Sequence, residues 1–410
     1  MPPPRTQNPP TVAAVEGSEV LSGEDRLGTQ NTRKAVTPSD RRRDRVGLHS
    51  AIRRLLIGHA ANTRPGTHAG NVYRTAACTW VRVSDVAVVR PADRDSYHYK
   101  GLTTCGSVWV CPLCASKIQE RRRTEVAQAI AFADARGDDM LMVSYTFPHR
   151  VDQPLALLLR LQQAAIKKLR ESRAYVAAML SIGNAGRIRS LEVTHGQNGW
   201  HPHTHELLFH RSEADPVHLR TVLAIQWLRA CKSVGLFQPD RDDELSFLAR
   251  SVDVRIGGDG VGQYLAKLDD QGKWGLSHEV TKSSSKQGRN AGRHPFALAS
   301  EKGTRHLFLE YVDAMKGQRQ LVWSRGLKAA VGIEEKTDEE LAQEDTARTV
   351  DRIEIPLPAW RIVLGNDARF EVVQAAQEGG YTAVRELLIL LGYTEPTEAD
   401  PCDPTIPAGT

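Results

Sequence analysis

The sequence predicts an α+β protein in which helices pack on a small antiparallel sheet. A small cysteine-bearing module precedes the sheet, and a helical C-terminal region follows it. Two observations predict this class. Short β-rich runs alternate with amphipathic helical runs between residues 140 and 256, and two of the β-rich runs are separated only by turn residues. This order favours a mostly antiparallel sheet with helices on one face.

The size and composition are those of an ordinary soluble protein. The chain has 410 residues, 40% hydrophobic and 25% charged, so it can bury a core and hold two or three domains. The first twenty residues contain no apolar segment, and runs such as Leu155–Leu159 are too short to cross a bilayer. We therefore expect a cytoplasmic protein without membrane contact.

The charge is unevenly distributed along the chain. Residues 336–410 carry a net charge of −9 and residues 1–335 a net charge of +14, within a total of +5. A basic body fits binding to phosphate backbones through the release of counterions, and an ordinary solvated surface is the alternative. We expect residues 336–410 to form an acidic, partly helical tail.

The N-terminal part is expected to combine a disordered arm with a small folded module. Residues 1–45 are rich in Pro, Arg, Thr and Ser without an apolar period, which predicts disorder, and a basic helix starts near the end of this arm, from about Ser39. Residues 46–138 form the module. A strand-like run at Val81–Val89 comes first, then cysteines, then a helix within 116–137 that Gly137 ends.

The next domain, residues 139–275, carries the alternating elements. The predicted strands are 140–147, 187–195, 203–210 and 251–256, and the middle two form an antiparallel pair. The predicted helices are a long amphipathic helix over 154–180, a helix over 216–236, and one that begins near residue 260. A basic loop and short helices follow in residues 276–335.

Three cysteines stand close together in the stretch CGSVWVCPLC. Cys105 precedes Cys111 by six residues, and Cys114 follows Cys111 by three. Thiolates at the latter spacing can bind one zinc ion, so we predict a structural zinc site with Cys78 as the fourth ligand and His98 as its competitor. A redox dithiol and unligated core cysteines are the alternatives. Clustered cysteines in a reducing cytosol favour the metal.

Histidines crowd the stretch GWHPHTHELLFH. In a strand that begins near Pro202, His203 and His205 project from the same face because residues two apart share a face. Two neighbouring imidazoles indicate a metal site, and a solvated strand edge is the alternative.

A tyrosine and a lysine follow in the stretch GVGQYLAKLDD. Tyr264 and Lys267 are three residues apart on the predicted helix and share a face. Alone, they would indicate a buried tyrosine beside a snorkelling lysine. Together with the histidines and a divalent metal, they suit cleavage of a phosphodiester.

From Cys78 to Gly332 the chain resembles a rolling-circle plasmid replication initiator of the HUH endonuclease superfamily. The resemblance is closest to the zinc-cysteine-bearing group of Gram-positive and actinobacterial plasmids. Five stretches carry it in order: CGSVWVCPLCASKI, MVSYTFPH, HPHTHELLF, QYLAK and LVWSRGLKAAVGI. Thr204 departs from the pattern, because the family has a hydrophobic residue between its two histidines. The fold implied is an HUH-type antiparallel sheet, with residues 139–275 as the nicking domain.

The resemblance implies a nickase mechanism. His203, His205 and Glu192 would ligate one Mg²⁺ or Mn²⁺, with His201 as an alternative ligand. Tyr264 would attack the scissile phosphate, leaving a 5′-phosphotyrosine and a 3′-hydroxyl primer. Lys267 would neutralise charge on the phosphate or the tyrosine oxygen.

The implied partners are origin DNA, single-stranded or as an extruded hairpin, and a host helicase and replicative polymerase. Arg121, Arg122 and Arg123 beside the cysteines, and the basic loop 282–294, would track backbone phosphates. Gly260 stands where relatives can carry a glutamate that helps to end the cycle. The alternatives are another HUH enzyme, either a mobilisation relaxase or a single-strand transposase, and a non-catalytic zinc-module DNA-binding regulator.

Overall fold

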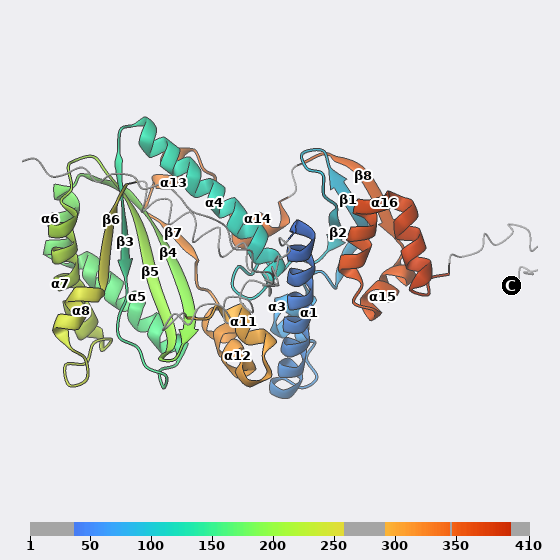
Figure 1. The fold of residues 1–410 in the computed structure, drawn as a ribbon, viewed down its shortest axis with the longest axis horizontal. Coiled ribbons are helices and arrows are strands. Elements are labelled where there is room, and N and C mark those ends of the chain that lie inside the picture. The colour runs from blue at the N-terminus through green and yellow to red at the C-terminus, as the bar shows by residue number, and fades with distance from the viewer. Residues whose placement is uncertain (1–36, 258–291, 345–346, 395–410) are drawn as a thin grey trace, which may run out of the picture. The chain divides into compact units, whose positions relative to one another are not determined.

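The computed structural model describes residues 37–257, 292–344 and 347–394 (Figure 1). It is a mixed α+β fold with two antiparallel sheets. Tyr264, Lys267, Gly260 and most of the basic loop 282–294 lie outside the described residues.

The larger sheet has five strands in the order β6-β3-β5-β4-β7. Every neighbouring pair in it is antiparallel, as the sequence predicts. Its strands are β3 (Asp139–Tyr145), β4 (Asn184–Gly196), β5 (Gly199–His210), β6 (Val252–Ile256) and β7 (Leu321–Trp323).

Helices cover both faces of this sheet, so the expectation of helices on one face is wrong. One face packs against α5 (Leu155–Glu171) and α7 (Pro216–Val234), and the other against α4 (Pro112–Ala135) and α13 (Leu327–Val331). The alternation along β5 explains this, because Leu208 enters the first core while Leu207 and Phe209 enter the second. A strand that is apolar on both faces requires two layers of helices.

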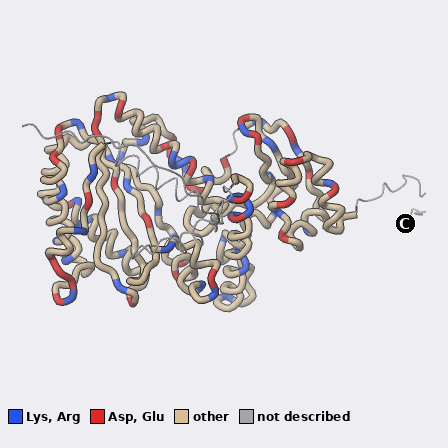
Figure 2. The backbone as a smooth tube through the Cα atoms, in the orientation of Figure 1, with Lys and Arg blue, Asp and Glu red and all other residues tan. Residues whose placement is uncertain are grey.

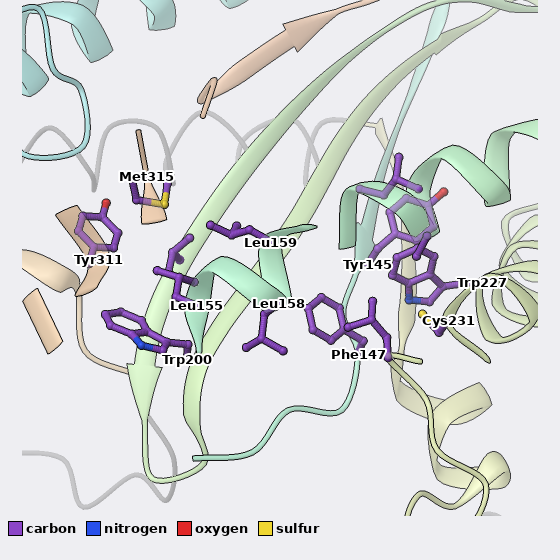
Figure 3. Close-up of a cluster of buried hydrophobic side chains, with 14 of the residues drawn as sticks. Tyr145, Phe147, Leu155, Leu158, Leu159, Trp200, Trp227, Cys231, Tyr311 and Met315 are labelled. Atoms are coloured by element: carbon purple, nitrogen blue, oxygen red, sulfur yellow. The ribbon is translucent and has the colours of Figure 1, made fainter. Parts of the chain in front are cut away.

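The first of these cores is built from aromatic and leucine side chains (Figure 3). Leu158 of α5 lies near Phe147, and Tyr145 of β3 packs against Trp227 of α7 with ring centroids 5.4 Å apart. The Trp227 indole donates a 2.7 Å hydrogen bond to the carbonyl of Thr146, so this buried ring also satisfies its polar atom.

The long helix predicted over 154–180 is two helices. After α5, Ser172 adopts an extended conformation (φ −71°, ψ 136°) and its hydroxyl accepts a hydrogen bond from the amide of Tyr175. That bond caps α6 (Arg173–Ser181) and breaks the helical run. The other helices that follow are α8 (Glu244–Arg250), α11 (Pro295–Ser300), the 3₁₀ turn Lys302–Thr304 and α12 (Arg305–Ala314).

The β4–β5 hairpin turns more tightly than the sequence indicated. Its loop is only Gln197 and Asn198, and Gly199 already belongs to β5 with φ +83°. A Cβ atom at Gly199 would lie 2.7 Å from the Cα of Val151, so this position requires glycine. Because β5 begins three residues before Pro202, His201 shares a face with the next two histidines.

The N-terminal helix α1 (Pro38–Thr63) starts where the basic run predicted it. Thr37 and Asp40 form a capping box at its start. Residues 38–45, assigned to the disordered arm, are therefore the first two turns of this helix. Two short helices follow it, α2 (Ala69–Val72) and α3 (Arg74–Ala77).

The acidic C-terminal segment is not a separate tail. Its strand β8 (Thr349–Ile355) pairs with β1 (Arg82–Pro91), which also pairs with β2 (His98–Leu102), and β1 confirms the strand predicted at Val81–Val89. The remaining helices are α14 (Asp338–Gln343), α15 (Leu357–Gly365) and α16 (Arg369–Leu390).

Carboxylates of this segment pair with arginines of the basic part of the chain. Glu339 binds Arg74 at 2.9 Å, and Asp338 binds Arg122 at 3.1 Å. Acidic and basic residues are accordingly interspersed over the described part of the chain (Figure 2). Among the described helices, none is long and apolar enough to span a bilayer.

Candidate metal centres

The four cysteines Cys78, Cys105, Cys111 and Cys114 lie together in a buried cluster. The sulfur atoms of Cys78 and Cys114 are 3.6 Å apart, and those of Cys105 and Cys114 are 3.7 Å apart. A tetrahedral zinc ion with Zn–S bonds of about 2.3 Å requires edges of about 3.8 Å. The cluster therefore has the dimensions of a zinc site, and Cys78 rather than His98 completes it.

Local structure holds the thiols in place. Cys111 is the N-cap of α4, and its sulfur accepts a hydrogen bond from the amide of Cys114 at 3.5 Å. The Cys105 sulfur accepts hydrogen bonds from the amide of Ser107 and the hydroxyl of Thr75, both at 3.5 Å. Donors to sulfur of this kind orient metal-bound thiolates and stabilise their charge.

The four thiols influence one another's ionisation. Burial raises the pKa of Cys111, and the hydrogen bond with Cys105 raises the pKa of Cys78. Hydrogen bonds from the neighbouring thiols lower the pKa of Cys114. One thiolate is thus stabilised at the expense of the others, because like charges this close cannot all form without a cation. The separations also exceed a disulfide bond, and the five described cysteines are free.

A second group lies on the five-stranded sheet, where Glu192 of β4 is directly opposite His203 of β5. One oxygen of Glu192 lies 2.8 Å from Nε2 of His203 and 3.1 Å from Nε2 of His205. Neighbouring ligands of an octahedral ion with bonds of about 2.1 Å lie about 3.0 Å apart. The two distances from Glu192 therefore match neighbouring ligands of a divalent cation, and all three atoms lie within 4.8 Å of one another. The same two distances suit hydrogen bonds from the imidazoles when no ion is bound.

The strands on either side orient this group. The hydroxyl of Ser144 on β3 lies 2.7 Å from Nδ1 of His205, so Nε2 is the ring nitrogen left to face Glu192. Burial acts to raise the pKa of Glu192, but the hydrogen bonds with His203 and His205 outweigh it and hold the pKa well below its usual range. An ionised carboxylate beside two imidazoles is a ligand set that could hold a divalent metal ion.

His201 shares the strand face but makes different contacts. Its Nε2 lies 2.9 Å from the hydroxyl of Thr146, and its ring stacks on His149 at 4.5 Å. Burial and the neighbouring His203 lower the pKa of His201 to about 3, so it is neutral at pH 7. His149, which ends the stretch MVSYTFPH, therefore stacks on His201 next to His203 of the Glu192 group.

Thr204, the departure from the family pattern, points to the opposite face. It is 2% exposed, and its hydroxyl accepts a 3.2 Å hydrogen bond from the side-chain amide of Gln162 on α5. Gln162 is itself 2% exposed, so the threonine provides the acceptor that this buried amide needs.

The three arginines predicted to bind DNA are engaged in ion pairs. Arg122 is partly buried and pairs with Glu125 at 2.9 Å and with Asp338 at 3.1 Å, so it fastens α14 to α4, and its DNA contact stays a prediction. Arg123 pairs with Glu120 at 2.7 Å, and Arg121 lies 3.8 Å from Glu344. The side chains of Arg121 and Arg123 are about two-fifths exposed, and their DNA contacts stay a prediction.

Sequence reasoning missed the residues that support the Glu192 group. Ser144 lies on β3 and Thr146 directly follows that strand, 61 and 55 residues before the histidines that they contact, and short hydroxyl side chains give no signal of such a role. Their positions follow only from the register that pairs Ser144 with His205.

Fold and sites together define an α+β chain with a buried four-cysteine group and a separate Glu-His-His group. The chain is similar to a protein named Protein rep from Streptomyces lividans, with 24% identity over 299 residues, 57% of this chain and 65% of that protein. It is also similar to a protein named Neomycin resistance protein from Streptomyces cyanogenus, with 28% identity over 133 residues, 26% of this chain and 30% of that protein. The matches thus span less than two thirds of either relative. No family model and no solved structure matches the chain.

Proposed function

We propose that the protein is a plasmid replication initiator of the HUH type, which nicks and rejoins one DNA strand at an origin. The main support is the Glu192, His203 and His205 group, whose ligand atoms lie within 4.8 Å of one another on adjacent antiparallel strands. The similarity to the protein named Protein rep supports a role in replication and does not bear on the nicking mechanism. The four-cysteine group would hold a structural Zn²⁺.

In this proposal the Glu192 group holds Mg²⁺ or Mn²⁺, which would polarise the scissile phosphate. The hydroxyl oxygen of Tyr264 attacks phosphorus and displaces the 3′-oxygen. A 5′-phosphotyrosine forms, and the 3′-hydroxyl primes synthesis. Lys267 lies one turn further along the predicted helix and offsets negative charge at the phosphate. The hydrogen bond with Ser144 keeps His205 oriented throughout.

The test is a cleavage assay on single-stranded DNA that spans the origin of the replicon encoding this chain. Wild type would be run with Mn²⁺ and with EDTA, beside Tyr264→Phe, His203→Ala and the control Tyr381→Phe, an exposed tyrosine on α16. We expect a metal-dependent protein–DNA adduct in wild type and control, and none in the other two variants.

Each alternative has its own signature in this assay. Cleavage that persists in Tyr264→Phe would refute the nucleophile while leaving the family open. A wild-type protein that binds origin DNA tightly but never cuts it would refute the nickase and favour the DNA-binding regulator. Cleavage at a transfer origin rather than a replication origin would favour a relaxase.

A further inference from the structure

A cavity of about 330 Å³ lies on the face of the sheet opposite the Glu192 group, beside α6. Arg170 at the end of α5 and Arg187 on β4 line it, together with Tyr175 and Asn184. Arg187 alternates on β4 with Ile188 and Glu192, which face the other side. The proposed nicking chemistry uses none of these residues.

Positive charge exceeds negative charge around this cavity. Arg170 pairs with Glu206, a carboxylate that is 2% exposed, and Arg189 lies directly across from Glu206 on the neighbouring strand. The charges of Arg170, Arg187 and Glu206 all act on Arg189, so three guanidinium groups lie near one carboxylate, and of these Arg170 and Arg187 line the cavity. Within the described residues, Arg187 and Arg189 have no ion pair. Burial and the charge of Arg170 lower the pKa of Arg189, although Glu206 acts to raise it.

Hydrogen-bond donors in the same place lack partners. Nε of Arg170 and Nδ2 of Asn184 are buried and have no hydrogen-bond partner within the described residues. The hydroxyl of Tyr175 has no acceptor there, although the guanidinium of Arg170 lies close enough to donate to its oxygen. Tyr175 is only 3% exposed. Buried donors without acceptors destabilise a fold, so several of them in one cavity indicate an acceptor that is bound there.

We propose that this cavity binds the phosphate group of a nucleotide. A phosphate offers several acceptor oxygens and negative charge to the arginines and the free donors, and arginine suits its geometry. The other wall is apolar, formed by Val176, Met179 and the 75%-exposed Leu180, and offers a surface to a base or sugar. The site does not depend on the proposed nicking function.

The test is calorimetric titration of the full chain with three probes: inorganic phosphate, dAMP and an unstructured strand of ten thymidines. The variants are the double variant Arg187→Gln/Arg189→Gln, Tyr175→Phe, and the control Arg229→Gln, an exposed arginine of α7 that does not line the cavity. We expect the double variant to weaken binding at least about tenfold and Tyr175→Phe about threefold to fivefold, with no change in the control.

The outcomes separate the sources of the phosphate. Binding of phosphate or dAMP that the double variant weakens identifies a free nucleotide. Binding of the strand alone, weakened in the same way, identifies a backbone phosphate. If no probe binds wild type, or the double variant binds as wild type does, the site is refuted.

Discussion

Replacing His49 with asparagine should flatten the dependence of stability on pH between 7 and 5. His49 is fully buried in α1, and its Nδ1 accepts a 3.3 Å hydrogen bond from Arg369. Burial and the charge of Arg369 lower its pKa from 6.5 to about 3. Its protonated form is therefore almost absent from the folded protein at pH 5.

The sign and the magnitude follow from linkage. Below pH 6.5 the unfolded chain binds a proton at this histidine and the folded chain does not. The contribution of His49 to the free energy of unfolding is therefore fully present above pH 6.5 and falls as the pH decreases. Between pH 7 and 5 the loss from this one residue is about 2 kcal/mol. The figure hardly changes for any folded pKa below about 4, because the folded protein stays unprotonated at pH 5.

The assay is urea unfolding at pH 7 and pH 5, followed by tryptophan fluorescence, for wild type, His49→Asn and the control His218→Asn. His218 is exposed at the start of α7. The asparagine oxygen can still accept from Arg369, so the variant should fold. Between pH 7 and pH 5 the free energy of unfolding of wild type and control should fall by about 2 kcal/mol more than that of His49→Asn. All three proteins contain the cysteine cluster, so the effect of pH on the cluster cancels in the comparison. Equal losses in all three proteins would refute the assignment of a neutral buried His49.

Three further changes test the packing and the cysteine cluster. Cys111→Ser should abolish bound zinc, measured by mass spectrometry, and lower the unfolding temperature, and retention of zinc would count against the four-thiolate site. Arg122→Gln should lower the free energy of unfolding in urea by about 2 kcal/mol because it breaks the partly buried ion pairs with Glu125 and Asp338, although Glu125 keeps its ion pair with Lys328. Arg123→Gln should lower it by less than about 1 kcal/mol because the pair of Arg123 is exposed. Leu158→Ala should lower the free energy of unfolding by about 3 kcal/mol, and Leu245→Ala, at an exposed site, by less than about 0.5 kcal/mol. Equal decreases would contradict the assignment of Leu158 to the core.

The alternation of residues in the two predicted strands and the spacing of the cysteines made the central hairpin and the cysteine cluster predictable. The period of two in residues 187–195 and 203–210 correctly gave the antiparallel pair and the shared face of His203 and His205. The cysteine spacing correctly gave a cluster, because thiols three residues apart at a helix start must lie close together. Both inferences depend on local geometry alone.

The features that sequence reasoning missed depend on contacts between distant segments. The acidic segment was read as a tail because its net charge differs from the rest, yet its carboxylates find partners in Arg74 and Arg122. The break at Ser172 was missed because the apolar period continues through it, although a single hydroxyl caps the second helix. The second layer of helices follows from Leu207 and Phe209, which face away from Leu208.

The strand β5 contributes residues to the Glu192 group on one face and to the Arg170–Glu206 pair on the other. Both groups therefore depend on its register. His203 and His205 face one side, while Thr204 and Glu206 face the other, where Glu206 pairs with Arg170. The same register sets Glu192 opposite His203 and Arg189 opposite Glu206. A slip by one residue would exchange the two faces and abolish both groups at once. Leu207, Leu208 and Phe209, buried on both faces, hold that register. The histidines therefore run directly into apolar residues because the core that follows them fixes where their side chains point.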